Sequence, residues 1–401
     1  ARVYLVVDGT GTIPPNSTGG KWNTERTLLQ IPVYKDSAAV SQVKITLTGA
    51  DDQGTDINLQ GAFVIKDDQG NVLKDAAGYP LYYINCAADA QPAVVSGLAA
   101  GSYYLSQISS QEGYQTAADT AFTVEDGKTT EAAVRNERLG SQVNTLKLTA
   151  EAFYGTQALT AERPQVFYAA LFSDEGLTKK CSDVKTMTTD AGLAVSTEAV
   201  FSMNVADQAQ TLYLARTDAF GTPVDDQADF TWAFQNEDGT AVSSVNFAAG
   251  ISSEQTLAMA DTYITYPSGE FSWQAEIQVT KQVLNREGKA TPVSSSFYIM
   301  LYGDQDHTQP LLETPVQIQL DNESSKEAVI SLPVTEAEAV VYGAETDDQG
   351  TPVVSGDKTF GYNVRFEGGT GGAVNVAVGS EAAMTVVNQQ CTDTVVQIRV
   401  T

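Results

Sequence analysis

The chain has 401 residues, which is long for one domain and comfortable for about two to four. Its 50 acidic residues outnumber its 23 basic ones and give a formal charge of −27, so it lacks the basic surface that nucleic-acid binding requires. A single histidine, His307, excludes histidine-based catalysis and a multi-histidine metal centre. The three cysteines include no CxxC pair that would bind zinc, and their odd number argues against a disulfide framework. We therefore expect neither a metal nor a cofactor.

No hydrophobic run is long enough to cross a membrane, and the chain carries neither a signal peptide nor a lipidation motif. The first residues, ARVYLVVDG, and the last, VVQIRVT at 395–401, both alternate as β-strands do. We expect a mature or excised segment of a longer protein. Either a further repeat begins at 395–401, or this strand docks on the last domain.

Nearly every segment predicts a short β-strand bounded by Gly, Asp or Asn turns. In chain order the clearest strands are KITLTG, AFVIKDDQGNVL, YYLSQIS, TAFTVEDGK, FYAALFSDEG and FYIMLYGDQD. Helical periodicity is weak and local, in SSEQTLAMA at 252–260. DDQG at 51–54, 67–70 and 347–350 and NEDG at 236–239 indicate turns, because the ligand spacing of a calcium loop is absent. These patterns predict an all-β chain of sandwich domains.

Three pairs of segments repeat in the same order at an offset of about 130 residues. FYAALFSDEG matches FYIMLYGDQD, ARTDAFGTPV matches AETDDQGTPV, and LKLTAEA matches IQVTKQV. We therefore expect two copies of one domain, at 141–268 and 269–401, preceded by a different β domain with an N-terminal extension at 1–140. Since the linkers are short, the three domains should form an elongated rod.

A lysine interrupts the apolar face of one strand, AEIQVTKQV at 275–283. With a period of two residues, Lys281 faces the same side as Val279 and Val283, where an unpaired ammonium would cost several kcal/mol. By the same parity Asn388 in MTVVNQQ and Glu345 in YGAETDD also face inward. Three polar side chains in one apolar interior are costly unless they satisfy one another.

Most of the chain beyond residue 42 resembles surface proteins of Gram-positive bacteria. LQGAFVIKDDQGNVL, VVSGLAAGSYYLSQ and VRNER resemble the B-type repeat of collagen adhesins, whose fold is immunoglobulin-like or prealbumin-like. Residues 269–401, with VTK, YGAETDDQG and VVN, resemble the pilin isopeptide-linkage domain. This resemblance implies a spontaneous bond between Lys281 and Asn388, with Glu345 as the buried acid that relays the proton.

The chemistry requires these three residue types. Burial lowers the pKa of a lysine and releases a neutral amine as nucleophile, and a protonated carboxyl can polarise the amide and pass a proton to departing ammonia. Two alternatives stay open: a hydrogen-bonded Lys–Glu–Asn cluster without a covalent bond, and a lysine that reaches out to solvent.

By alignment, the 141–268 copy lacks all three residues, and the first domain keeps only the asparagine. The equivalent positions are Ala150, Arg216 and Met259 in the 141–268 copy, and Gly49, Gln107 and Asn136 in the first domain. Lys44 points to the opposite side of its strand and is a poor substitute for the missing lysine. We expect one cross-linked domain of three.

The resemblance implies a non-enzymatic adhesin or pilus subunit on the cell wall, anchored through a C-terminal region outside this chain. Its partners would be a host extracellular-matrix protein or a glycan and, in a pilus, other subunits. Ser268 stands where polymerising subunits carry a lysine after Tyr-Pro, which favours a tip, basal or stalk role. The alternative is a non-catalytic module of a large secreted carbohydrate-active enzyme or scaffold.

Overall fold

The computed structural model describes residues 40–391 except 90, 227–228, 358 and 368–371. The predictions for the N-terminal extension and for 395–401 lie outside these residues. The described part of the chain is all-β, with 28 strands and no α-helix. The stretch 252–260, which shows weak helical periodicity, instead belongs largely to strand β20, where Leu257 and Met259 are buried and Ala258 between them is only partly so.

The strands form six sheets that face one another in pairs, giving three β-sandwiches. The first sandwich contains β1 (Gln42–Ala50), β2 (Asp56–Asn58), β3 (Gly61–Lys66), β4 (Tyr83–Cys86), β5 (Ala93–Ser96), β6 (Gly101–Ser110), β7 (Tyr114–Gln115), β8 (Thr120–Val124) and β9 (Thr129–Arg138). Its sheets have the orders β2-β1-β9-β7, with β5 also on β1, and β4-β3-β6-β8.

The middle sandwich contains β10 (Val143–Tyr154), β11 (Gln157–Ala158), β13 (Gln165–Phe172), β14 (Lys185–Thr189), β15 (Ala199–Asn204), β16 (Gln210–Arg216), β17 (Phe230–Gln235), β18 (Ala241–Val242), β19 (Ser244–Phe247) and β20 (Glu254–Tyr263). Its sheets have the orders β11-β10-β20-β17-β18, with β15 also on β10, and β14-β13-β16-β19.

The last sandwich contains β21 (Phe271–Leu284), β22 (Val293–Tyr302), β23 (Val316–Glu323), β24 (Ser325–Val334), β25 (Glu338–Thr346), β26 (Tyr362–Glu367), β27 (Ala373–Ala377) and β28 (Ala382–Gln390). One sheet has the order β12-β21-β28-β26, with β24 also paired to β21, and the other has the order β23-β22-β25-β27. The short strand β12 (Thr160–Ala161) comes from the middle part of the chain. In each sandwich the first long strand pairs in parallel with the last one.

Each sandwich has its own apolar core between its two sheets. The core arises from strands in which every second side chain is buried, as in β10 and β9. The expected boundaries near 140 and 269 fall between β9 and β10 and just before β21. That the three sandwiches are independent domains remains a prediction.

The turns follow the predicted chemistry. The Asp51 carboxylate accepts hydrogen bonds from the backbone N–H groups of Gln53 and Thr55, at 2.9 and 2.8 Å, and Gly54 adopts a φ of 81°. Asp347 and Gly350 repeat this arrangement, with a φ of 85° at the glycine. A positive φ explains why glycine ends each of these tetrapeptides.

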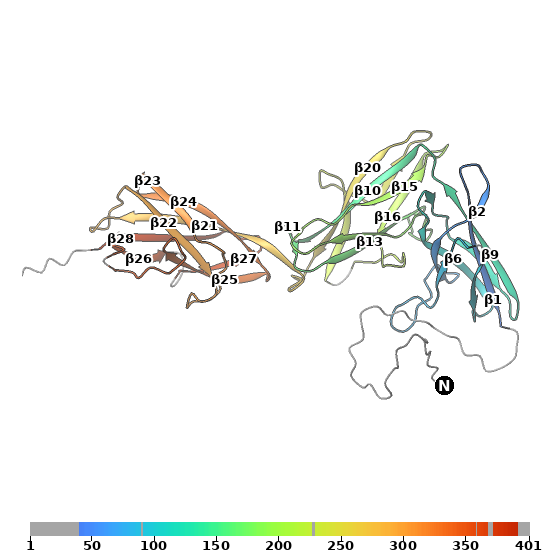
Figure 1. Cartoon of the computed structure of the whole chain (residues 1–401), viewed down its shortest axis with the longest axis horizontal. Helices are drawn as coiled ribbons and strands as arrows, with labels where there is room; N and C mark the ends of the chain where they lie inside the picture. Colours follow the sequence, from blue (N-terminus) through green and yellow to red (C-terminus); the bar gives the residue numbers. More distant parts are fainter. Residues whose placement is uncertain (1–39, 90, 227–228, 358, 368–371, 392–401) are drawn as a thin grey trace, which may run out of the picture.

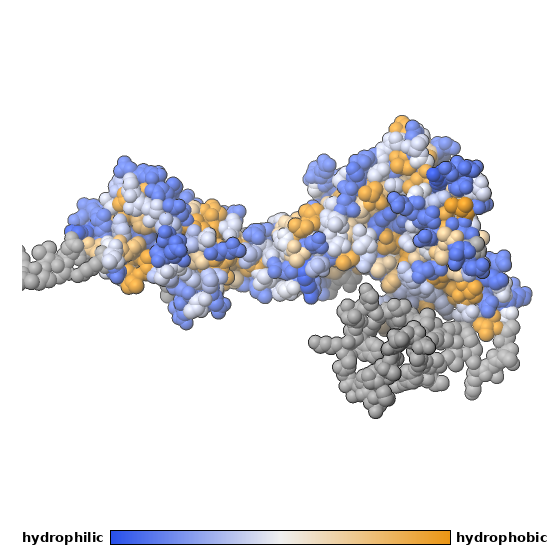
Figure 2. All heavy atoms as spheres, viewed as in Figure 1, coloured by the Kyte–Doolittle hydropathy of each residue, from blue (hydrophilic) through white to orange (hydrophobic). Residues whose placement is uncertain are grey.

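The molecule is elongated (Figure 1), and the last sandwich continues the long axis while the first lies against the flank of the middle one. A narrow neck joins the middle and last sandwiches (Figure 2). There β12 pairs with the start of β21, Thr160 opposite Ser272, and Leu159 and Ala161 pack with Trp273 in one core. Strand β21 therefore runs without interruption from the neck into the last sandwich.

Candidate functional site

The structure brings together the three residues that sequence parity places inside the last sandwich. Strand β21 carries Lys281 and its parallel neighbour β28 carries Asn388, two residues further along than the direct partner of Lys281, Val386. Glu345 comes from β25 in the opposite sheet. The relative exposures are 0% for Lys281, 3% for Glu345 and 0% for Asn388. The lysine does not reach out to solvent, so that alternative is wrong.

Glu345 bridges the other two side chains. Its Oε2 accepts a hydrogen bond from Lys281 Nζ at 2.7 Å, and its Oε1 accepts one from Asn388 Nδ2 at 2.8 Å. Asn388 Oδ1 is buried and has no hydrogen-bond partner among the described residues. The carboxyl group is thus positioned to exchange protons with both the amine and the amide nitrogen.

An aromatic ring covers the amine, and a second aromatic ring packs against the first. Lys281 Nζ lies 4.4 Å from the centroid of the Phe297 ring, and Tyr362 packs against Phe297 edge-to-face at 5.9 Å. Burial lowers the pKa of Lys281 to about 8, although the nearby Glu345 carboxylate raises it. Burial, and secondly Glu345, raise the pKa of Tyr362. A neutral amine is therefore far more accessible here than on an exposed lysine.

Phe297 and Tyr362 were not identified from the sequence. Phe297 begins the repeated segment FYIMLYGDQD, and strand parity with Ile299 would have placed it inward. Tyr362 follows a loop whose length differs between the repeats, so its position depended on the strand register.

The middle sandwich corrects one of the aligned positions. Met259 is the direct partner of Ala150, just as Val386 is the direct partner of Lys281. Asn388 lies two residues beyond Val386, so its counterpart is Asp261, two residues beyond Met259. The loops between the repeated segments differ in length, and this shifts the register by two residues. The expected loss of the lysine at Ala150 is unaffected.

Arg216, which is partly exposed, forms an ion pair with the buried Asp261 in the middle sandwich. Arg216 Nε and Nη2 lie 3.0 and 2.9 Å from Asp261 Oδ2, and the guanidinium stacks 4.6 Å from the Phe230 ring centroid. Burial raises the pKa of Asp261 to about 6, against the lowering effect of Arg216. A non-covalent pair thus occupies two of the three positions, and Ala150 offers no amine.

The first sandwich needs a similar correction. Gly49 is the direct partner of Asn136, just as Val283 is the direct partner of Asn388. Lys281 lies two residues before Val283, so its counterpart is Leu47, two residues before Gly49. Gln107 and Asn136 are buried, and both side-chain oxygens accept from the Ala117 N–H, at 3.4 and 3.2 Å. Lys44 is exposed, as expected. No amine is available in the first sandwich at this position.

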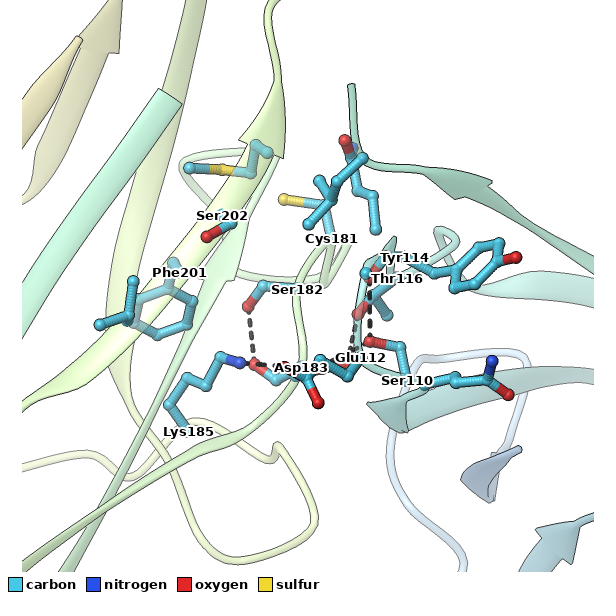
Figure 3. Close-up of a pocket in the computed structure, with 16 residues that line it drawn as sticks. Ser110, Glu112, Tyr114, Thr116, Cys181, Ser182, Asp183, Lys185, Phe201 and Ser202 are labelled. Carbon is cyan, nitrogen blue, oxygen red and sulfur yellow. Dashed lines mark hydrogen bonds and ion pairs between the residues drawn. The ribbon is translucent and has the colours of Figure 1, made fainter. Parts of the chain in front are cut away.

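The described residues contain no group of three or more His, Cys, Asp or Glu side chains arranged to hold a metal ion. They also contain no helix long and apolar enough to cross a membrane. The three cysteines are unpaired thiols. A cleft of about 320 Å³ lies between the first and middle sandwiches, where Asp183 accepts hydrogen bonds from Ser110 and Thr116 (Figure 3).

No protein-family model matches the chain, and neither does any curated protein. Among solved structures, the chain is similar to the TIE protein of Bacillus anthracis, with 12% identity and a TM-score of 0.23 over 88% of this chain and 51% of that one. The chain thus spans about half the length of that protein. It is also similar to BcpA, the major pilin subunit of Bacillus cereus, with 12% identity and a TM-score of 0.18 over 88% and 100% of the two chains.

A streptococcal ancillary pilin gives 11% identity and a TM-score of 0.19, again over 88% of this chain and 100% of that one. Likeness at this level carries no argument about function. The functional argument rests on the residues of the last sandwich.

Proposed function

We propose that this chain is a stalk or adhesin subunit of the Gram-positive surface-protein type, and that an isopeptide bond between Lys281 and Asn388 locks its last sandwich. The observation that carries the proposal is the fully buried amine and amide, joined by one carboxyl group at 2.7 and 2.8 Å. A hydrogen-bonded cluster without a bond would leave Asn388 Oδ1 buried and without a hydrogen-bond partner among the described residues.

The reaction begins with proton transfer from the Lys281 ammonium to Glu345, along their hydrogen bond. The low dielectric of the core makes this transfer less costly than it would be in water. Lys281 Nζ then attacks Asn388 Cγ, held near it by adjacent strands. If the amide turns about its Cβ–Cγ bond, the protonated carboxyl donates to Oδ1 and polarises the carbonyl.

The collapse of the tetrahedral intermediate releases Asn388 Nδ2 as ammonia. One Nζ proton goes to Glu345 and one proton from Glu345 goes to the leaving nitrogen, so the products are a secondary amide, NH₃ and the carboxylic acid. Each chain reacts once and acts on no external substrate, so the chain is not an enzyme. The phenyl ring of Phe297 excludes water from the amine while this takes place.

The position of the bond suits a structure that bears tension. It joins the first and last strands of the last sandwich, and β21 is continuous with the neck. Tension between the start of β21 and the end of β28 would load their parallel ladder in shear, and the covalent bond within that ladder would keep the two strands joined after its hydrogen bonds break. We further propose that the three sandwiches are domains at 1–140, 141–268 and 269–401, that the protein is extracellular and anchored to the cell wall, and that it binds a matrix protein or glycan or other pilus subunits.

Single-molecule force spectroscopy on the whole chain tests this function. With the bond in place, the segment from Lys281 to Asn388 stays closed, so about 37 nm of contour length is missing from the extended chain. Lys281→Ala should release that length in an additional unfolding event. Release of the full length by the wild-type protein would contradict a load-bearing role for the bond.

A further inference from the structure

A second fully buried lysine lies outside the candidate cross-linking site. Lys180, just before β14, has a relative exposure of 0%, and it sits where the middle sandwich meets the first. Its Nζ donates hydrogen bonds to the backbone carbonyl of Ser182, at 2.8 Å, and to the carbonyl of Gln107 in the first sandwich. No described carboxylate lies within ion-pair distance of this amine. The lysine therefore crosses from one sandwich into the other.

The carbonyl group that accepts from Lys180 is exposed by an irregularity in the β4-β3-β6-β8 sheet of the first sandwich. Strands β3 and β6 pair Ala62 with Ser109 and Phe63 with Gln107, so Ile108 is left as a β-bulge. The bulge turns two carbonyl groups toward the middle sandwich. Gln107 accepts from Lys180 Nζ, and Ile108 accepts from the backbone N–H of Val184 at 3.0 Å.

The surroundings of the lysine are shaped to hold it. Gly221 has a φ of 81°, and a Cβ there would lie 2.9 Å from Lys180 Cδ, so only glycine leaves room for the lysine stem. Ala62, Val64 and Ile108 of the first sandwich pack with Val184 and Phe220 of the middle one around this contact. Further contacts cross the junction, among them Lys74 with Asp218, and Asp183 with Ser110 and Thr116.

The last sandwich supplies an internal comparison. Lys180 forms an isolated bridge with Phe172, and the matching bridge in the last sandwich joins Tyr302 to Pro310. Pro310 is exposed, and no described sandwich packs on it. The lysine is therefore present in the middle sandwich, where the first sandwich packs on this position, and absent from the last sandwich, where nothing described packs on it.

We propose that Lys180 locks the first and middle sandwiches into one rigid body by inserting its amine into the β-bulge of β6. The lock fixes the two walls of the cleft in Figure 3, which is lined by 110–116 of the first sandwich and by 181–185 and 200–203 of the middle one. A cleft with walls from two sandwiches keeps its shape only if the sandwiches do not move apart. This inference does not depend on the bond at Lys281.

Amide hydrogen exchange at Val184 tests the proposal on the whole chain, because its N–H bonds across the junction. Lys180→Met keeps most of the side-chain length and removes the donors, and Lys179→Met changes the exposed neighbour as a matched control. We expect exchange at Val184 at least tenfold faster in Lys180→Met and within twofold of wild type in Lys179→Met. Leu148, inside the β10–β20 ladder, should keep its protection in both variants.

Three results would overturn the proposal. Unchanged exchange at Val184 in Lys180→Met would show that the lysine does not hold the junction. Equal acceleration at Val184 and Leu148, or failure of the variant to fold, would show that the lysine supports the middle sandwich itself.

Discussion

Replacing Asn388 by alanine removes the electrophile and leaves the Lys281–Glu345 pair intact at 2.7 Å. The bond would close a loop of about 107 residues, which by analogy with a disulfide stabilises the last sandwich by ~4–5 kcal/mol through the unfolded chain. Because Nδ2 leaves as ammonia when the bond forms, the hydrogen bond lost with Asn388 is the one between the new amide and Glu345, which adds ~1 kcal/mol. For a unit of this size, the loss corresponds to a fall of about 15–20 °C in the melting temperature of the last sandwich.

Scanning calorimetry of the whole chain measures this fall, and Asn136 provides a matched control. Asn136→Ala removes the same side chain at the equivalent, equally buried position of the first sandwich, where no lysine is present. It should cost only about 1–2 kcal/mol, mainly from the lost hydrogen bond to the Ala117 N–H. If Asn388→Ala and Asn136→Ala lower their respective transitions by similar amounts, the reasoning from loop closure is wrong.

Three further predictions concern the reaction itself. Glu345→Gln cannot take up the amine proton, so this variant should keep the full sequence mass in electrospray mass spectrometry, and loss of ammonia at the wild-type rate would exclude the proton relay. The reactive state, a neutral amine beside a protonated carboxyl, carries the same single proton as the ion pair, and the pKa of Lys281 is lowered to about 8, so bond formation in a chain refolded from denaturant should slow as the pH rises above 8; a rate that keeps rising there would contradict the role of the protonated carboxyl. In the middle sandwich, Ala150→Lys with Arg216→Glu places an amine and an acid beside Asp261, and the mass should fall by about 18 Da, one water, because the acceptor is a carboxyl group.

The sequence allowed the all-β fold and the inward side of each strand to be predicted, because burial follows a period of two residues. This alternation was sufficient to predict that the side chains of Lys281, Glu345 and Asn388 point into the core of the last sandwich. The register between strands was not predictable in the same way, since it depends on loop lengths. Asp261 and Leu47 were missed for this reason, each by two residues.

Burial caused by one sandwich packing on another left no periodic signal in the sequence. Lys180 follows LTK and precedes CSD, a polar stretch that indicates a surface loop. It is buried because the first sandwich covers it, and the acceptor it needs exists because β6 contains a bulge at Ile108. Neither feature follows from local propensity.

The central claim is the covalent bond, and the intact mass of the folded protein tests it most directly. The wild-type chain, measured under denaturing conditions after folding, should weigh about 17 Da less than its sequence, one ammonia, and Lys281→Ala should match its own sequence mass. A peptide joining the segments around Lys281 and Asn388 should appear after proteolysis. Wild-type protein at the full sequence mass would contradict the account and leave the three side chains as a buried hydrogen-bonded cluster.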